Sequence, residues 1–134
     1  MGVQNPTLNI FGQVNNTANQ TLTSATLTLL TSIVSPSTLP AGTYKVGFTG
    51  EFQSVSSGAT ITAQLFVNGV ADADTSRTIA PFDAGALSAF SAQGVIAFEQ
   101  FITITAGQTF EVRDSRSAGN AVAGERTMTW LKVL

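Results

Sequence analysis

The sequence predicts an all-β protein, a sandwich or barrel built from about eight to ten short antiparallel strands. Threonine and β-branched residues are frequent along the chain, which favours strands over helices. Short segments alternate apolar and polar residues with a period of two, and turn-forming residues separate them. A length of 134 residues suits one domain with a core of its own.

The composition argues against several kinds of chemistry. The chain has no cysteine and no histidine, so it lacks disulfides and also the commonest general base and metal ligand. Charged residues make up 10% of the chain, the net charge is −2, and the six cationic residues are scattered, which argues against nucleic-acid binding. We expect no cofactor, no metal and no membrane association, because the apolar runs are too short to cross a bilayer.

Residues 1–20 are rich in asparagine, glutamine and threonine. They also include four apolar residues: Leu8, Ile10, Phe11 and Val14. We interpret them as an N-terminal arm or edge segment before a single domain at 21–134. This segment is either a frayed end with a first edge strand or an arm that docks on a neighbouring subunit. It lacks the pattern of a signal peptide, and we expect a complete small gene product.

Two strands are predicted between residues 21 and 52. In the first, the spacing of Leu27, Leu30 and Val34 would also suit a helix, but the many threonines and serines favour a strand. The second follows a Pro-Ala-Gly turn at 40–42 and is the clearest strand of the chain. Its apolar residues, predicted to face the core, are Tyr44, Val46, Phe48 and Phe52. The outward Lys45 and Glu51 are expected to be solvated or intersubunit charges.

A β-hairpin is predicted at Asn68-Gly69, because both positions of a tight hairpin turn favour positive φ. Residues 60–67 alternate before this turn, with Ile61 and Leu65 on the apolar face. Residues 72–79 are expected to form a second arm or a loop. Residues 80–94, rich in alanine, glycine and serine, are interpreted as a long connection with some strand.

The C-terminal part contains further predicted strands. The first, at 95–104, is expected to have a break in register at Glu99-Gln100. The turn Ala106-Gly107-Gln108 repeats the earlier Ala-Gly turn. Residues 114–124 are expected to form a flexible loop. The last strand, at 126–134, is apolar on both faces, which predicts that a core covers one face and another layer or subunit covers the other.

Acidic residues could in principle support chemistry. Asp72 and Asp74, with Asp83, could bind Ca²⁺, but a calcium loop brings more oxygen ligands and a fixed glycine, so a solvated hairpin end is the better interpretation. The charged segment 113–116 could form a salt-bridge cluster at a subunit seam or lie in water.

An enzyme is the third and least favoured class of function. Glu51, Glu99 and Glu111 could act as an acid and base pair, but they occupy outward strand positions where exposed carboxylates are ordinary. No Ser-His-Asp triad can form without histidine. We therefore do not expect catalytic activity.

The turns and strands together resemble a known family. Leu39-Pro40-Ala41-Gly42-Thr43-Tyr44 opens an alternating strand, Val67-Asn68-Gly69 ends the next, and the segments 102–110 and 126–131 follow. This order resembles the jelly-roll heads of the tumour necrosis factor and complement globular-head type, in particular the phage and bacterial versions found in virion proteins. The resemblance covers residues 21–134.

The resemblance implies an antiparallel jelly-roll β-sandwich that forms a homotrimer, with one sheet of each subunit facing the three-fold axis. On this basis the apolar last strand and the additional phenylalanines would line the trimer contact. The expected interface residues are Trp130, Leu131, Val133 and Phe66. The receptor and calcium sites of vertebrate members have no matching pattern here.

We expect a structural virion protein, a trimeric decoration or cement protein that binds the major capsid protein and stabilises the head shell. It would be made in the host cytoplasm and lie on the capsid surface. The predicted capsid anchor is the arm, through Leu8, Ile10, Phe11 and Val14, with three weak arms per trimer acting by avidity. Deleting residues 1–18 should then leave a folded trimer that no longer binds particles.

The alternative is a receptor- or carbohydrate-binding head of a phage fibre or tail. It would use the loops at 53–59, 80–94 and 114–124 to bind a host surface glycan. The expected contacts are Phe82, Phe90 and Arg116.

Overall fold

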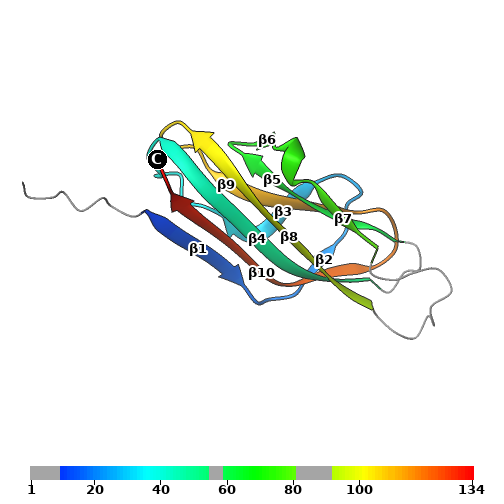
Figure 1. Ribbon diagram of the computed structural model, residues 1–134. Coiled ribbons are helices and arrows are strands. Elements are labelled where there is room, and N and C mark those ends of the chain that lie inside the picture. The colour runs from blue at the N-terminus through cyan, green and yellow to red at the C-terminus, as the bar shows by residue number, and fades with distance from the viewer. Residues whose placement is uncertain (1–9, 55–58, 81–91) are drawn as a thin grey trace, which may run out of the picture.

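The computed structural model describes residues 10–54, 59–80 and 92–134, which form a sandwich of two β-sheets (Figure 1). The described elements are β1 (Phe11–Asn16), β2 (Gln20–Leu22), β3 (Thr28–Val34), β4 (Gly42–Ser54), β5 (Ile61–Val67), β6 (Val70–Ala71), the 3-10 helix η1 (Ala73–Thr75), β7 (Arg77–Ile79), β8 (Ala92–Ile104), β9 (Phe110–Arg116) and β10 (Ala121–Lys132). The described part of the chain contains no α-helix, and no helix there could cross a membrane.

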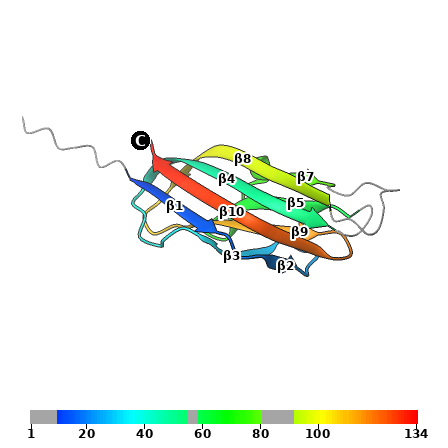
Figure 2. The same cartoon turned by 90° about the horizontal axis from the view of Figure 1, so that it is seen from below.

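Each sheet contains five strands and pairs strands that are distant in the sequence. The β4 sheet has the order β1-β10-β4-β8, with β2 also paired to β10. The β5 sheet has the order β3-β9-β5-β6, with β7 also paired to β5. All the pairs are antiparallel, and the two sheets lie face to face (Figure 2). The predicted all-β jelly-roll sandwich is confirmed.

β4 is the central strand of its sheet. It pairs with β8 along all 13 residues, from Gly42 opposite Ile104 to Ser54 opposite Ala92. The pairing is continuous, so the predicted break at Glu99-Gln100 is wrong. Gln100 occupies an inward position at the open side of the sandwich, where it is half-buried and its Nε2 lies 3.5 Å from Asp74 Oδ2 of η1. A polar residue can therefore interrupt the apolar pattern without interrupting the strand.

The core lies between the two sheets and is built from alternate residues of each strand. The predicted core residues of β4 are all fully buried or nearly so: Tyr44, Val46, Phe48 and Phe52. Tyr44 packs edge to face on Phe110 of β9, with ring centroids 5.5 Å apart, and its hydroxyl donates to the Pro40 carbonyl at 2.8 Å. These contacts tie the β4 sheet to the β5 sheet and to the turn before β4.

The predicted hairpin joins β5 and β6. Val67 pairs with Val70, and Asn68 and Gly69 have φ values of 48° and 80°. Positive φ at both central positions matches the type I′ turn that an Asn-Gly pair predicts.

Two further stretches differ from or extend the prediction. The two Ala-Gly turns lie side by side, since Gly107 N donates to the Leu39 carbonyl at 2.9 Å. β9 continues to Arg116 and β10 begins at Ala121, so the connection predicted over 114–124 is confined to residues 117–120. The polar residues at the end of β9 remain in the strand because they pair with β5, with Ser115 opposite Thr62.

β1 is an edge strand that covers the indole ring of Trp130. It pairs with β10 from Phe11 opposite Leu131 to Asn16 opposite Arg126. Gly12 lies opposite Trp130, and a Cβ atom at this position would meet the indole ring. The missing side chain of Gly12 therefore leaves the space that the ring occupies.

We predict that Gly12→Ala lowers the free energy of unfolding by about 1 to 3 kcal/mol, the usual cost of overpacking a core. Gly124→Ala is the matched control, because a Cβ there would meet its nearest neighbours at an ordinary 3.6 Å. Urea unfolding of both variants tests this. Equal free energies of unfolding for the two variants would show that β1 does not pack on the Trp130 indole ring.

Candidate interaction surface

The outward face of the β4 sheet carries a row of large side chains at one end. The register places Phe11, Leu131, Lys45 and Phe101 side by side on β1, β10, β4 and β8. Phe11 is 61% exposed and Phe101 is 63% exposed. We call these four residues, all of them apolar except Lys45, the apolar row. The sequence prediction missed Phe101, because the expected break at Glu99-Gln100 left the face of this residue undetermined.

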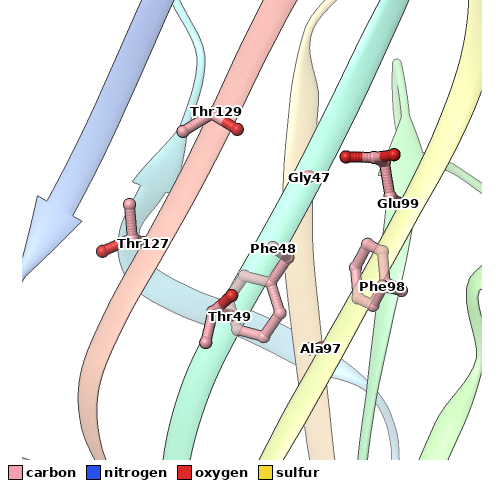
Figure 3. Close-up of a pocket in the computed structure, with 8 residues that line it drawn as sticks. All are labelled: Gly47, Phe48, Thr49, Ala97, Phe98, Glu99, Thr127 and Thr129. Carbon is pink, nitrogen blue, oxygen red and sulfur yellow. The ribbon is translucent and has the colours of Figure 1, made fainter.

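A shallow depression of about 480 Å³ lies next to the apolar row. Figure 3 shows the residues that line it. Small and polar residues of three strands line it: Gly47, Thr49, Ala97, Glu99, Thr127 and Thr129. Beneath it, Phe48 and Phe98 are stacked in the core with ring centroids 5.3 Å apart. The small residues lower the surface here, and the stacked rings form its floor.

Two charges on this face compensate each other. Lys45 Nζ lies 3.4 Å from Glu99 Oε2, and both side chains are largely exposed. An exposed pair of this kind adds little stability, but it reduces the net charge that an approaching surface would meet. The surface around Lys45 and Glu99, next to the apolar row, is therefore nearly neutral.

A second concave feature lies at the open edge of the sandwich, between β8 and the β5–β6 hairpin. We call it the edge groove; its volume is about 520 Å³. Its apolar lining comes mainly from Val67, Val70, Phe101 and Ile102. Val70 is 70% exposed, so large apolar side chains stand on both sides of the groove. Asp72 also lines it.

An aspartate and an arginine are buried between the sheets. Asp114 of β9 is 2% exposed and Arg126 of β10 is 1% exposed. Burial raises the pKa of Asp114 to about 7, against the lowering effects of its own backbone hydrogen bond and of the Arg126 charge. Burial also lowers the pKa of Arg126. Asp114 Oδ2 and Arg126 Nε have no hydrogen-bond partner among the described residues.

Two arginines hold the connection between β1 and β3. Arg126 Nη1 donates to the Ala18 carbonyl at 3.0 Å. Arg116 donates to the Leu22 carbonyl at 2.7 Å and to the Thr23 carbonyl at 3.1 Å. The predicted charged cluster at 113–116 thus serves in part to fix this segment. Arg113 instead pairs with Glu111 at 2.5 Å.

The residues of the predicted capsid anchor have different surroundings in the structure. Leu8 lies outside the described residues. Ile10 and Val14 are partly buried against the core of their own chain, whereas Phe11 points outward in the apolar row. Deleting residues 1–18 would remove all of β1, so a deletion that ends before Ile10 is the cleaner test of the arm.

The predicted trimer-interface residues also differ in their surroundings. Trp130 is 4% exposed in its own core, and Phe66 is 8% exposed beneath Arg113, whose guanidinium carbon lies 4.2 Å from the ring centroid. Neither has much surface left for a neighbour. Leu131 is half-buried and Val133 is 40% exposed, so these two remain available.

The residues of the predicted alternatives are not brought together. Phe82, Phe90 and Asp83 lie outside the described residues. Arg116 is occupied with backbone carbonyls. Asp72 caps η1, with its Oδ1 accepting from the Asp74 amide at 3.0 Å. The described segments contain no cluster of three acidic residues that could hold a metal ion.

The predicted acid and base residues are spread over both sheets. Glu51 and Glu99 lie on outward positions of the β4 sheet. Glu111 belongs to β9 of the other sheet, where it binds Arg113. The three glutamates therefore form no common site.

Comparisons with known proteins identify the fold. No protein-family model matches the chain, and no curated protein matches its sequence. The tumour necrosis factor Eiger of S. frugiperda superposes with a TM-score of 0.62 at 14% identity, covering 94% of this chain and 93% of that one. Latent PorU of Porphyromonas gingivalis gives a TM-score of 0.64 at 11% identity, over 92% of this chain but 12% of PorU.

A pentameric capsid protein from metagenomic phage sequences is also similar, but its TM-score of 0.33 is too low to support an argument. The chain thus shares the jelly-roll fold of a tumour necrosis factor. At these identities the likeness concerns the fold alone.

We predict that the stability of the protein falls as the pH rises from about 4 to about 7. In this window the unfolded chain has lost the Asp114 proton, at an ordinary pKa of 3.8, while the folded chain retains it up to about pH 7. The size is on the order of a few kcal/mol, since each unit of pKa shift corresponds to about 1.4 kcal/mol.

Asp114→Asn should remove this part of the pH dependence, and Glu125→Gln, an exposed carboxylate of the same region, should not. Urea unfolding between pH 4.5 and 8 measures the slopes. If wild type and Asp114→Asn have parallel profiles, Asp114 does not carry the effect.

Proposed function

We propose that the protein is a homotrimeric structural component of a virion that decorates and stabilises the capsid shell. The observation that carries this proposal is the apolar row beside a shallow depression on the outward face of the β4 sheet.

The outward face of the β4 sheet has the character of an assembly surface. Two phenylalanines expose more than half of their surface in one row, together with Leu131. Only Lys45 separates the Phe11–Leu131 pair from Phe101 in this row, and large apolar side chains exposed together usually mark a protein-protein contact. All four residues of the row belong to paired strands, so a partner can pack on them without ordering a loop.

When two different surfaces of one chain contact each other between copies, a closed ring satisfies both surfaces on every copy. β1 and β8 form opposite edges of the β4 sheet. A contact between one edge region and a different region of the next copy is heterologous, and such contacts close into rings when the rotation allows it. Three copies match the arrangement that the tumour necrosis factor resemblance implies.

The proposal that the major capsid protein is the partner rests on the resemblance to virion jelly rolls. A trimer presents each weak shell-binding site three times, so that avidity can hold it on the major capsid protein without a large interface per subunit. The surface of the virion is the expected location, after synthesis in the host cytoplasm. No catalysis is proposed.

We predict that the protein has three times its chain mass of 13.9 kDa in solution and that Thr49→Arg lowers this mass to that of a monomer. Thr49 is exposed in the depression, so a bulky cation there obstructs packing without disturbing the core. Thr78→Arg, at an exposed position of the β5 sheet, is the matched control. Light scattering measures all three proteins, and a monomeric wild type would overturn the trimer.

We further predict that the wild type co-sediments with shells assembled from the major capsid protein of the same virion. Thr49→Arg should bind these shells at least tenfold more weakly, because the loss of linkage removes avidity gains of about 10² or more. Thr78→Arg again serves as the control. Binding to host surface polysaccharide with no affinity for shells would support the fibre-head alternative instead.

A further inference from the structure

The edge groove lies at the same height along the strands as the point where the N-terminal segment leaves the sheet. Ile10 accepts a hydrogen bond from Lys132 N at 2.8 Å. Lys132 pairs with Tyr44, and Tyr44 pairs with Ile102, which lines the edge groove. One row of residues therefore connects the start of β1 to the groove on the opposite edge.

We propose that residues 1–9 of one subunit dock in the edge groove of the next subunit of the trimer. This inference rests on the proposed homotrimer. β1 and β8 are opposite edges of one sheet (Figure 2). A head-to-tail neighbour therefore presents its edge groove beside the first subunit's β1. Rotation about a three-fold axis parallel to the strands does not change the position of a residue along that axis. Residues at the same height in one subunit therefore lie at the same height in its neighbours. The contact is heterologous, and three of them close the ring.

The length of the segment suits this path. Nine extended residues reach about 30 Å. The β4 sheet, from β1 to β8, is three strand spacings wide, which is about 14 Å. The segment can therefore leave one sheet and cross a neighbouring edge without pulling β1 out of its pairing with β10.

The chemistry of the segment matches that of the groove. Residues 1–9 carry no charged side chain and include Val3 and Leu8. The groove offers exposed Val70 and Phe101, with Asp72 as its charged lining residue. Docking therefore buries apolar surface on both partners and desolvates little charge, which is the favourable combination for a short peptide.

The test uses disulfide trapping, which has no background because the chain has no cysteine. In the double variant Leu8→Cys with Val70→Cys, the thiol at position 8 of each subunit faces one neighbour, and the thiol at position 70 faces the other neighbour. After oxidation we expect covalent trimers on a non-reducing gel, the product of a closed head-to-tail ring. Leu8→Cys with Thr78→Cys, placed on an exposed position of the β5 sheet, should remain largely unlinked.

The mass of the reduced variant separates this inference from the proposed function. A reduced monomer overturns the trimer itself. A reduced trimer that yields only internally linked monomers, only covalent dimers or no linked product leaves the trimer intact and overturns the docking proposal.

A second measurement does not depend on disulfide geometry. Maleimide labelling of the single variant Val70→Cys should become several-fold faster when residues 1–8 are removed, because the groove is then uncovered. An unchanged labelling rate overturns the proposal. If the truncated protein also loses its binding to capsid shells while labelling is unchanged, the segment is a capsid anchor, as the sequence predicted.

Discussion

The pairing of β4 with β10 on one side and β8 on the other is the constraint on which both faces of the molecule depend. A shift of one residue in this register would exchange every side chain between the core and the outward face. The register that buries Tyr44 and Val46 is therefore the same one that aligns Lys45 with Leu131 and Phe101. Core packing and the candidate interaction surface are two results of one set of backbone hydrogen bonds.

Local signals were sufficient to predict an all-β sandwich or barrel, and the family resemblance narrowed this to a jelly roll. Alternation revealed β4 and β5, and the Asn68-Gly69 pair identified the hairpin, because each depends on a few adjacent residues. The surroundings of Trp130 and Arg126 could not be predicted in this way. The last strand is apolar on both faces, so its sequence does not say which face is inward. A bulge between Ala123 and Arg126 also shifts the alternation and turns a charged residue into the core.

The candidate surface was harder to predict than the core, because its parts come from four strands. Phe11 and Phe101 are 90 positions apart in the chain, and only the pairing order of the β4 sheet brings them into one row. Phe66 is an outward residue that the structure shows to be buried. Its outward position follows from the alternation of β5, but its burial depends on Arg113 of β9, and the pairing of β9 with β5 cannot be predicted from local sequence.

The contact between Gly12 and Trp130 has a consequence for spectroscopy. Trp130 is the single tryptophan of the chain, and the edge strand that covers it leads directly into the N-terminal segment. Indole emission shifts to longer wavelength when the ring meets water. The protein thus carries an intrinsic fluorophore at its β1 edge, and its emission would report whether that edge stays closed when copies of the chain come together or separate.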